Sequence, residues 1–352
     1  MSQYWNQNTR DLTPYVPGEQ PQIQGLIKLN TNENPYPPSP AVDQAVNSAL
    51  AKLHLYPDPN ATVLKQTIAS YNGLNENQVF VGNGSDEVLA LLFKTFFSVD
   101  KPVLFPDITY SFYPVYCNLY DLTAERVPLD DNLQINVNDY TAEASGIIFA
   151  NPNAPTGDLL PLADIERLLQ ARQDVVVVVD EAYVDFGGES AVSLIDRYAN
   201  LLVVQTLSKS RSLAGLRVGF AMGHVDLIAG LERVKNSFNS YPVDVLAQAA
   251  AVASFGDQAY FDMAVTKVIN SRQWLGDQLQ ALGFTVLPSA TNFILVCHAT
   301  ANSSELQQTL RQKNILTRYF NQPRIQAYLR ITIGTQEECE ALVGALREIL
   351  GA

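Results

Sequence analysis

The chain of 352 residues has few of the side chains that mark a metal centre or a disulfide framework. Metal ligands recur at short spacings, and disulfide scaffolds are short and rich in cysteine. The 3 cysteines and 3 histidines are instead far apart: Cys117, Cys297, Cys339, His54, His224 and His298. We therefore expect reduced thiols and no metal, and we assign none of these residues a catalytic role.

Clusters of basic residues and long apolar runs are also lacking. The formal net charge is -13, and no block of Lys and Arg could neutralise several phosphates at once, which argues against a nucleic-acid partner. No run of about 18 apolar residues occurs. Residues 1–11 lack the charged and apolar regions of a signal peptide. We expect a cytoplasmic protein with no membrane partner.

A dinucleotide-binding motif is the third absence. No Gly-x-Gly-x-x-Gly follows the first predicted strand with an acidic residue about 20 positions on, which argues against a dehydrogenase. What is present is an ordinary globular composition, 47% hydrophobic and 17% charged. The length allows one large domain and a smaller companion, because single cores stop growing near roughly 250 to 300 residues.

The hydrophobic pattern predicts an α/β fold with a mostly parallel central sheet flanked by helices. The proline-rich residues 1–40 are expected to form an extended arm rather than a helix, joined to the smaller domain. Residues 41–250 alternate helical spacing with short apolar runs, and residues 251–352 are typical of a smaller α+β domain. The expected strands are Val79–Val81, Val103–Phe105, Gly146–Ala150, Val175–Val179, Leu201–Leu207, Gly283–Leu287, Thr291–Val296 and Tyr328–Ile333.

Three polar side chains follow consecutive strands of the predicted large sheet. Asn151 follows Gly146–Ala150, Asp180 follows the buried valine run, and Lys209 comes just after Leu201–Leu207. In open α/β sheets, ligands bind beyond the carboxyl ends of the strands. We therefore expect Asn151, Asp180 and Lys209 to meet in one crevice.

These side chains match the needs of pyridoxal 5'-phosphate. That cofactor needs an amine for a Schiff base, a carboxylate near its ring nitrogen, donors at its phenolic oxygen and a phosphate cradle. Lys209 is the candidate amine, Asp180 the carboxylate, and Asn151 with Tyr183 the donors. Each residue alone has an ordinary structural explanation, but their order along the chain favours the cofactor.

The phosphate cradle is expected where a strand gives way to a helix. Gly84, Ser85 and Asp86 precede an apolar helical pattern, and free backbone N–H groups at a helix start can hold phosphate. A plain capped turn explains this stretch about equally well. Thr206, Ser208 and Arg217 are expected to complete the cradle.

The motifs resemble those of the aspartate-aminotransferase fold family of pyridoxal-phosphate enzymes, fold type I. The likeness rests on Asn-Pro-Asn-Ala-Pro-Thr-Gly at 151–157, Asp-Glu-Ala-Tyr at 180–183, Ser-Lys at 208–209 and Ala-Gly-Leu-Arg-Val-Gly at 214–219. The opening segments 12–18, 28–36 and 56–59 resemble the histidinol-phosphate aminotransferase subfamily. Ala154, and Ser210-Arg211-Ser212 after the lysine, depart from the family pattern.

The resemblance implies roles for further residues. It implies a homodimer with shared active sites, in which Tyr56 reaches the neighbouring subunit's cofactor phosphate. Tyr110 would stack on the cofactor ring. Arg330 would anchor the substrate's anionic group and Arg318 would help bind phosphate. Tyr15, Asn30 and Asn34 would line the substrate region.

The implied reaction is a ping-pong transamination with Lys209 as Schiff base and proton shuttle. Histidinol phosphate and 2-oxoglutarate would give imidazole acetol phosphate and glutamate, in histidine biosynthesis. An aromatic amino-acid aminotransferase or a threonine-phosphate decarboxylase remains open as an alternative. A regulatory module that binds the same cofactor would carry a DNA-binding segment ahead of this domain, whereas here the domain begins near Met1.

Overall fold

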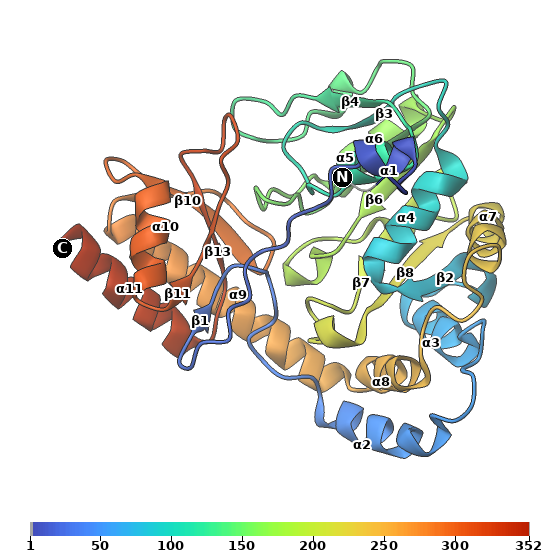
Figure 1. The fold of residues 1–352 in the computed structure, drawn as a ribbon, viewed down its shortest axis with the longest axis horizontal. Helices are drawn as coiled ribbons and strands as arrows, with labels where there is room; N and C mark the ends of the chain where they lie inside the picture. The colour runs from blue at the N-terminus through green and yellow to red at the C-terminus, as the bar shows by residue number, and fades with distance from the viewer. Residues whose placement is uncertain (1–2, 352) are drawn as a thin grey trace.

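A seven-stranded sheet forms the larger part of the molecule in the computed structural model, which describes residues 3–351 (Figure 1). Neighbouring strands are parallel except β8, which runs antiparallel to β2 and β7. The predicted fold class, a mostly parallel central sheet flanked by helices, is thus confirmed. The strands in spatial order are β2 (Val79–Asn83), β8 (Val218–Gly223), β7 (Leu201–Thr206), β6 (Val176–Asp180), β5 (Gly146–Ala150), β3 (Val103–Pro106) and β4 (Ala124–Val127).

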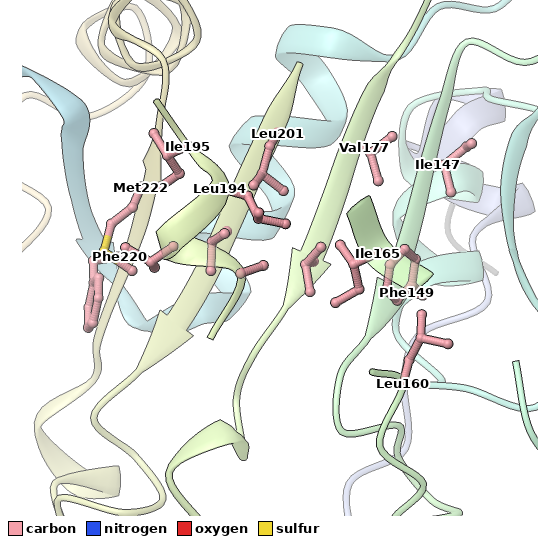
Figure 2. Close-up of a cluster of buried hydrophobic side chains, with 14 of the residues drawn as sticks. Ile147, Phe149, Leu160, Ile165, Val177, Leu194, Ile195, Leu201, Phe220 and Met222 are labelled. Atoms are coloured by element: carbon pink, nitrogen blue, oxygen red, sulfur yellow. The ribbon is translucent and has the colours of Figure 1, made fainter. Parts of the chain in front are cut away.

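The two faces of this sheet are buried under different helices. Alternate side chains of a strand point to opposite faces, so Val177 and Val179 enter one hydrophobic cluster and Val178 enters another. Figure 2 shows the first cluster, with Ile147, Val177 and Leu201 side by side on neighbouring strands. Helices α3 (Thr62–Asn72), α6 (Leu162–Ala171) and α8 (Val245–Gly256) contribute to it, and α4 (Gly84–Phe96), α5 (Tyr113–Leu119) and α7 (Val225–Asn236) contribute to the other.

Strand register decides where the polar side chains lie. Ala150 pairs with Asp180, and Asp180 with Val204, so β5, β6 and β7 end at one edge of the sheet. These strands are apolar except at the last residue of β6 and the last two of β7, which suits full burial. The carboxyl edge is therefore the first place where this part of the chain can present polar groups.

A smaller part of the molecule is built on a four-stranded antiparallel sheet with its own hydrophobic core. The helix α9 (Gln258–Ala281), 24 residues long, connects it to the larger part (Figure 1). The strand order is β12 (Arg318–Tyr319), β13 (Leu329–Thr332), β10 (Phe293–His298), β9 (Phe284–Val286), and helices α10 (Ser303–Gln312) and α11 (Gln336–Leu350) complete it.

The N-terminal residues contact both parts of the molecule. Strand β1 (Ile27–Lys28) pairs in parallel with β11 (Ile315–Leu316), whereas the ring of Tyr15 packs on Phe112 of the larger part. The expectation that this arm has no helix is wrong at one place, α1 (Gln7–Asp11). Asn6 caps α1, and the helix ends before Pro14 because residues that precede proline disfavour the helical conformation.

The remaining helices are short or peripheral. Helix α2 (Pro40–Ala49) packs on α8, and its start is capped by Ser39. None of the helices within residues 3–351 is both long and apolar enough to cross a membrane. The single-turn helices are η1 (Leu50–Lys52), η2 (Glu76–Gln78), η3 (Val137–Asp139), η4 (Val184–Phe186), η5 (Ala191–Leu194) and η6 (Ala214–Leu216).

Candidate active site

Two adjoining cavities open at the carboxyl edge of the large sheet. The inner cavity is about 110 Å³ and the outer one about 320 Å³. They share the side chains of Asp86, Tyr110, Ala154, Tyr183 and Lys209, so they form one continuous site. The inner cavity is lined otherwise by the large sheet and its loops, and the outer cavity by the N-terminal arm and the small sheet.

Lys209 lies where the inner and outer cavities meet. It follows β7, and Asn34 Nδ2 holds its backbone carbonyl at 3.1 Å. The ammonium donates to the Thr31 carbonyl at 3.5 Å and lies 5.7 Å from the centre of the Tyr183 ring. No carboxylate within residues 3–351 is in ion-pair distance of this nitrogen. Its nitrogen therefore faces the site without an ion-pair partner among the described residues.

Asp180 is the buried carboxylate at the end of β6. Tyr113 Oη donates to it at 2.9 Å and the Ala182 N–H at 3.3 Å. Burial raises the pKa of Asp180 to about 6, and these two hydrogen bonds partly oppose that rise. A buried anion of this kind needs a cationic partner. The protonated ring nitrogen of pyridoxal phosphate would supply one, so this side chain fits the cofactor.

The turn before α4 forms a cradle at the inner cavity. Gly84 has a φ of 77°, in the left-handed region that favours glycine. A Cβ on Gly219 of β8 would lie 2.2 Å from the Ser85 nitrogen, so glycine is required there for β8 to approach the turn. The helix that starts here has 13 residues, and its free N–H groups face the end where phosphate would bind.

Arg217 closes the cradle from the opposite side. Its Nη2 pairs with Asp86 at 2.8 Å and its Nη1 donates to Ser208 Oγ at 3.3 Å. Thr206 Oγ1 in turn donates to Ser208 at 3.0 Å. Three hydroxyl or guanidinium groups thus meet beside the helix start, and guanidinium pairs well with phosphate oxygens. This donor set fits a phosphate group.

Tyr110 provides an aromatic face in both cavities. Its hydroxyl donates to Asp86 at 3.0 Å, and its ring lies edge-on to Tyr113 at 5.6 Å. Burial raises the pKa of Tyr110 well above its ordinary value, so it stays a neutral donor. The ring is held from two sides and can offer its face to a flat ligand.

Asn151 is not among the residues that line the two cavities, although Ala154 of the same loop lines both. Its Nδ2 donates to the Leu160 carbonyl at 3.1 Å and its Oδ1 accepts from the Leu160 N–H at 2.8 Å. These two bonds close the loop, because the Leu160 backbone groups are buried and need partners. They use only one of the two Nδ2 protons, so a donor role of Asn151 at the cofactor's phenolic oxygen stays a prediction beside that of Tyr183.

Arg330 is the main cation of the outer cavity. Its Nη2 donates to the Asn30 carbonyl at 3.0 Å, whereas its buried Nε has no partner. Burial lowers the pKa of Arg330 to about 10, which still leaves it charged at neutral pH. Arg318 lies opposite it on the adjacent strand. Within the described residues no carboxylate pairs with either guanidinium, so together they can receive an anion.

The other expected substrate residues divide into two groups. Tyr15 and Asn30 line the outer cavity. Asn34 does not, because its amide is used to hold the backbone of Lys209 and Ser210. Tyr56 lies outside both cavities of its own chain, with 84% of its surface exposed and its ring stacked on Tyr241 at 4.8 Å.

Tyr113, whose hydroxyl donates to Asp180, was not foreseen from the sequence. Asn32 falls within the segment 30–34 expected in the substrate region, but its role there was not foreseen: its Nδ2 donates to Tyr183 Oη at 2.9 Å. This contact is visible only in three dimensions, because the two residues are far apart in the chain.

Comparisons with known proteins agree with this geometry. A model of the family "Aminotransferase class I and II" matches residues 24–346, which places the chain in that class. A histidinol-phosphate aminotransferase of Methylococcus capsulatus is 58% identical over 99% of this chain and 98% of its own length. One from Pseudomonas putida is 59% identical over 98% of this chain and 100% of its own length. The chain belongs to the histidinol-phosphate aminotransferase family.

Solved structures show the same fold. A histidinol-phosphate aminotransferase from Sinorhizobium meliloti, solved in complex with pyridoxal-5'-phosphate, has a TM-score of 0.91 at 24% identity and covers 100% of this chain and 98% of its own. A Thermus thermophilus aspartate aminotransferase mutant has a TM-score of 0.85 at 18% identity, covering 99% of this chain and 100% of its own. The chain is a transaminase whose cofactor is pyridoxal 5'-phosphate, as the residues of the inner cavity predict.

Proposed function

We propose that this enzyme transfers the amino group of histidinol phosphate to 2-oxoglutarate, giving imidazole acetol phosphate and glutamate in histidine biosynthesis. The observation that carries the proposal is the pair Arg318 and Arg330, two guanidinium groups without carboxylate partners among the described residues. They stand in the outer cavity that also contains Lys209. A phosphate on the donor, or the far carboxylate of the acceptor, suits both cations.

The inner cavity holds the cofactor and the residues that move protons. Bound pyridoxal phosphate supplies the carbonyl that condenses with amines and a ring that withdraws electrons. The Ser85 N–H, Ser208 and Arg217 would bind its phosphate, and Asp180 would stay anionic beside its ring nitrogen. Lys209 Nζ, once it is no longer bonded to the cofactor, would take the proton from the donor's α-carbon and then give it to the C4′ carbon of the cofactor.

The outer cavity orients the substrate and keeps water out. Arg330 fixes the anionic end of the substrate at a set distance from Lys209, so that the amine end meets the cofactor. Tyr15 lies over the cavity from the N-terminal arm, with its ring on Phe112 at 4.8 Å. Donor and acceptor would bind here in turn, which gives ping-pong kinetics.

A screen of amino donors with 2-oxoglutarate tests the assignment. We expect histidinol phosphate to give the highest kcat/KM, with glutamate formed in equal amount. A higher value with phenylalanine or tyrosine would overturn it in favour of an aromatic amino-acid aminotransferase. Carbon dioxide release from threonine phosphate without loss of 2-oxoglutarate would indicate a decarboxylase instead.

We also propose a homodimer in which Tyr56 reaches the partner's cofactor phosphate. The exposed Tyr56 stacks on Tyr241, which is also exposed, and its chain neighbours Leu53 and Leu55 are exposed as well, which supports an interface on this surface. Sedimentation should give twice the mass of the 38.7 kDa chain. Mixed dimers of Lys209→Ala and Tyr56→Phe chains should contain one intact site; activity no higher than that of the Tyr56→Phe homodimer would contradict the shared site.

The domain boundaries and the cellular location stay proposals as well. We propose an arm of residues 1–40, a cofactor domain of residues 41–250 and a small domain of residues 251–352. The separate sheets and hydrophobic cores support two such domains, and the core of the larger part extends through α8 (Val245–Gly256), across the proposed boundary. Limited proteolysis near residue 40 and at the junction of α8 and α9 tests the division.

A cytoplasmic location is proposed because the relatives are named as aminotransferases of histidinol phosphate, a small molecule. Fractionation of cells tests this proposal.

A further inference from the structure

Asn32 is buried at the point where the N-terminal arm meets the small sheet and Tyr183. It is 2% exposed, and its φ of 58° lies in the left-handed region, which asparagine tolerates better than most residues. Its backbone carbonyl accepts from Asn292 Nδ2 at 2.9 Å. The residue is thus held at both its backbone and its side chain.

The hydroxyl of Thr332 fixes which way the Asn32 amide points. Thr332 Oγ1 accepts from the Asn32 backbone N–H at 3.0 Å and donates its own proton to Asn32 Oδ1 at 3.0 Å. The described residues offer this proton no other acceptor. With the amide turned over, the buried hydroxyl proton of Thr332 would have no partner. Nδ2 must therefore face Tyr183.

This orientation determines what the Tyr183 hydroxyl can do. A phenol has one proton, and its oxygen here accepts a hydrogen bond from Asn32 Nδ2 at 2.9 Å. The Tyr183 proton is consequently free to be donated elsewhere. Tyr183 lines both cavities, and no other hydrogen bond of its hydroxyl occurs within residues 3–351.

We propose that Asn32 is a positioning residue that turns the Tyr183 proton toward the cofactor's phenolic oxygen, and that Thr332 sets its direction. One Asn151 amide proton is used by Leu160, and Ala154, the residue of the same loop that lines the cavity, has no side-chain donor. Tyr183 lines the cavity with a hydroxyl proton that no acceptor among the described residues takes, so the direction of that proton matters for the cofactor.

The inference rests on the cofactor site and not on the choice of amino donor. A failed donor screen would therefore leave it untouched, because its test needs no substrate. A donor at the phenolic oxygen stabilises the form in which Lys209 has lost its proton. The pH midpoint at which the visible absorbance of the resting holoenzyme changes should rise when that donor is lost or misdirected.

The experiment is a spectrophotometric pH titration of four holoenzymes: wild type, Asn32→Gly, Tyr183→Phe and the double variant. Glycine accepts the left-handed backbone and removes only the amide. We expect the midpoint to rise by about half a pH unit in Asn32→Gly and by more in Tyr183→Phe. The double variant should match Tyr183→Phe, because Asn32 acts through that hydroxyl. None of these changes alters a charge among the groups that surround Lys209: Glu33, Asp86, Asp180, Arg217 and Arg330.

A second pair of variants keeps the proposal falsifiable if Asn32→Gly binds cofactor poorly. Thr332→Val removes the hydroxyl that orients Asn32, and it should raise the midpoint in the same direction by a smaller amount. Thr317→Val is the matched control, because Thr317 is equally buried but its hydroxyl has no hydrogen-bond partner. An unchanged midpoint in Asn32→Gly or, if that variant does not load, in Thr332→Val would overturn the proposal. So would full additivity in the double variant.

Discussion

The inner and outer cavities are built in different ways from the same chain. The inner cavity takes its side chains from the ends of neighbouring strands and from the turn before α4, all within one sheet. The outer cavity takes Tyr15 and Asn30 from the arm and Arg318 and Arg330 from the small sheet. The first depends mainly on the register of the strands and on the turns that follow them, and the second depends on how separate segments pack.

This difference separates two tasks. The inner residues fit the cofactor, which is common to the class, and each has its geometry fixed by buried neighbours such as Tyr113 behind Asp180. Arg318 and Arg330 of the outer cavity have no ionic partner among the described residues and can therefore bind an anionic substrate. Chemistry is therefore expected to fail when the inner cavity is changed, and selectivity when the outer one is changed.

Replacing Lys209 should give the largest effect. Lys209→Ala removes both the covalent anchor and the base, so kcat should fall by about four orders of magnitude or more. The visible absorbance of the lysine-bound cofactor should disappear. Lys52→Ala, in the exposed η1 helix, is the control and should keep both. A Lys209→Ala enzyme that turns over and stays yellow would mean that another residue holds the cofactor.

Replacing Asp180 should lower kcat by about 10² to 10⁴-fold, because the cofactor ring loses its anionic partner. In the cofactor-free protein the same replacement should instead raise the free energy of unfolding. Burial raises the folded pKa of Asp180 from 3.8 to about 6, so ionising this side chain destabilises the fold. That loss is small near pH 4 and reaches its full size above about pH 6.

Unfolding of cofactor-free protein at different pH values checks that sign. Relative to Asp180→Asn, the wild type should lose roughly 2 kcal/mol of unfolding free energy between pH 4 and pH 7. Denaturant titrations of both proteins measure this difference, and the titration of shared groups cancels. If the free energy of unfolding changed with pH in the same way in both proteins, burial would not raise the pKa of Asp180.

Changes in the outer cavity should affect substrates and spare the cofactor. Arg330→Gln should raise the KM for the phosphorylated donor by about 10 to 100-fold, since a charge-assisted pair is lost. The resting cofactor spectrum should be unchanged. Arg318→Gln should have a smaller effect in the same direction, because this residue lies on the short edge strand β12. If steady-state kinetics showed that these two variants lower kcat and leave KM unchanged, the outer cavity would not be the part that selects the substrate.

Asn151 gives the smallest expected effect on activity and a clear one on stability. Asn151→Ala leaves the buried N–H and carbonyl of Leu160 without partners, which should cost about 3 kcal/mol of unfolding free energy. The second Nδ2 proton is not used in that loop, so the pH midpoint of the cofactor spectrum should also rise. A midpoint that stays at the wild-type value would remove Asn151 from the cofactor shell, and denaturant titration measures the loss of stability.

Most of the residues expected at the cofactor line the inner cavity, because they follow strand ends that meet at one edge of the sheet. The valine run that becomes β6, and the glycine turn before α4, carry local signals of their own. Strand β8 was not among the expected strands, because Gly219 and Gly223 interrupt its apolar pattern. Gly219 in fact allows β8 to pack against Ser85, which is a contact between distant segments.

The side-chain directions could not be read from the sequence. Asn151 stands at the expected strand end, yet its amide turns back to its own loop because Leu160 needs it. Asn32 donates a hydrogen bond to Tyr183, which is 151 positions away in the sequence, and Tyr113 donates one to Asp180, which is 67 positions away. The short helix α1 depends on a cap by Asn6 ahead of the first proline. Such partners become visible only once the chain is folded.

The preference for a phosphorylated donor tests most directly whether the inner cavity serves the cofactor and the outer cavity selects the substrate. The kcat/KM values for histidinol phosphate and for histidinol should differ by about 10³-fold in the wild type. In the Arg318→Gln and Arg330→Gln double variant the ratio should fall below about 10, with the cofactor spectrum intact. A preference that survives in that variant would contradict the account, because phosphate would then be recognised outside these two cations.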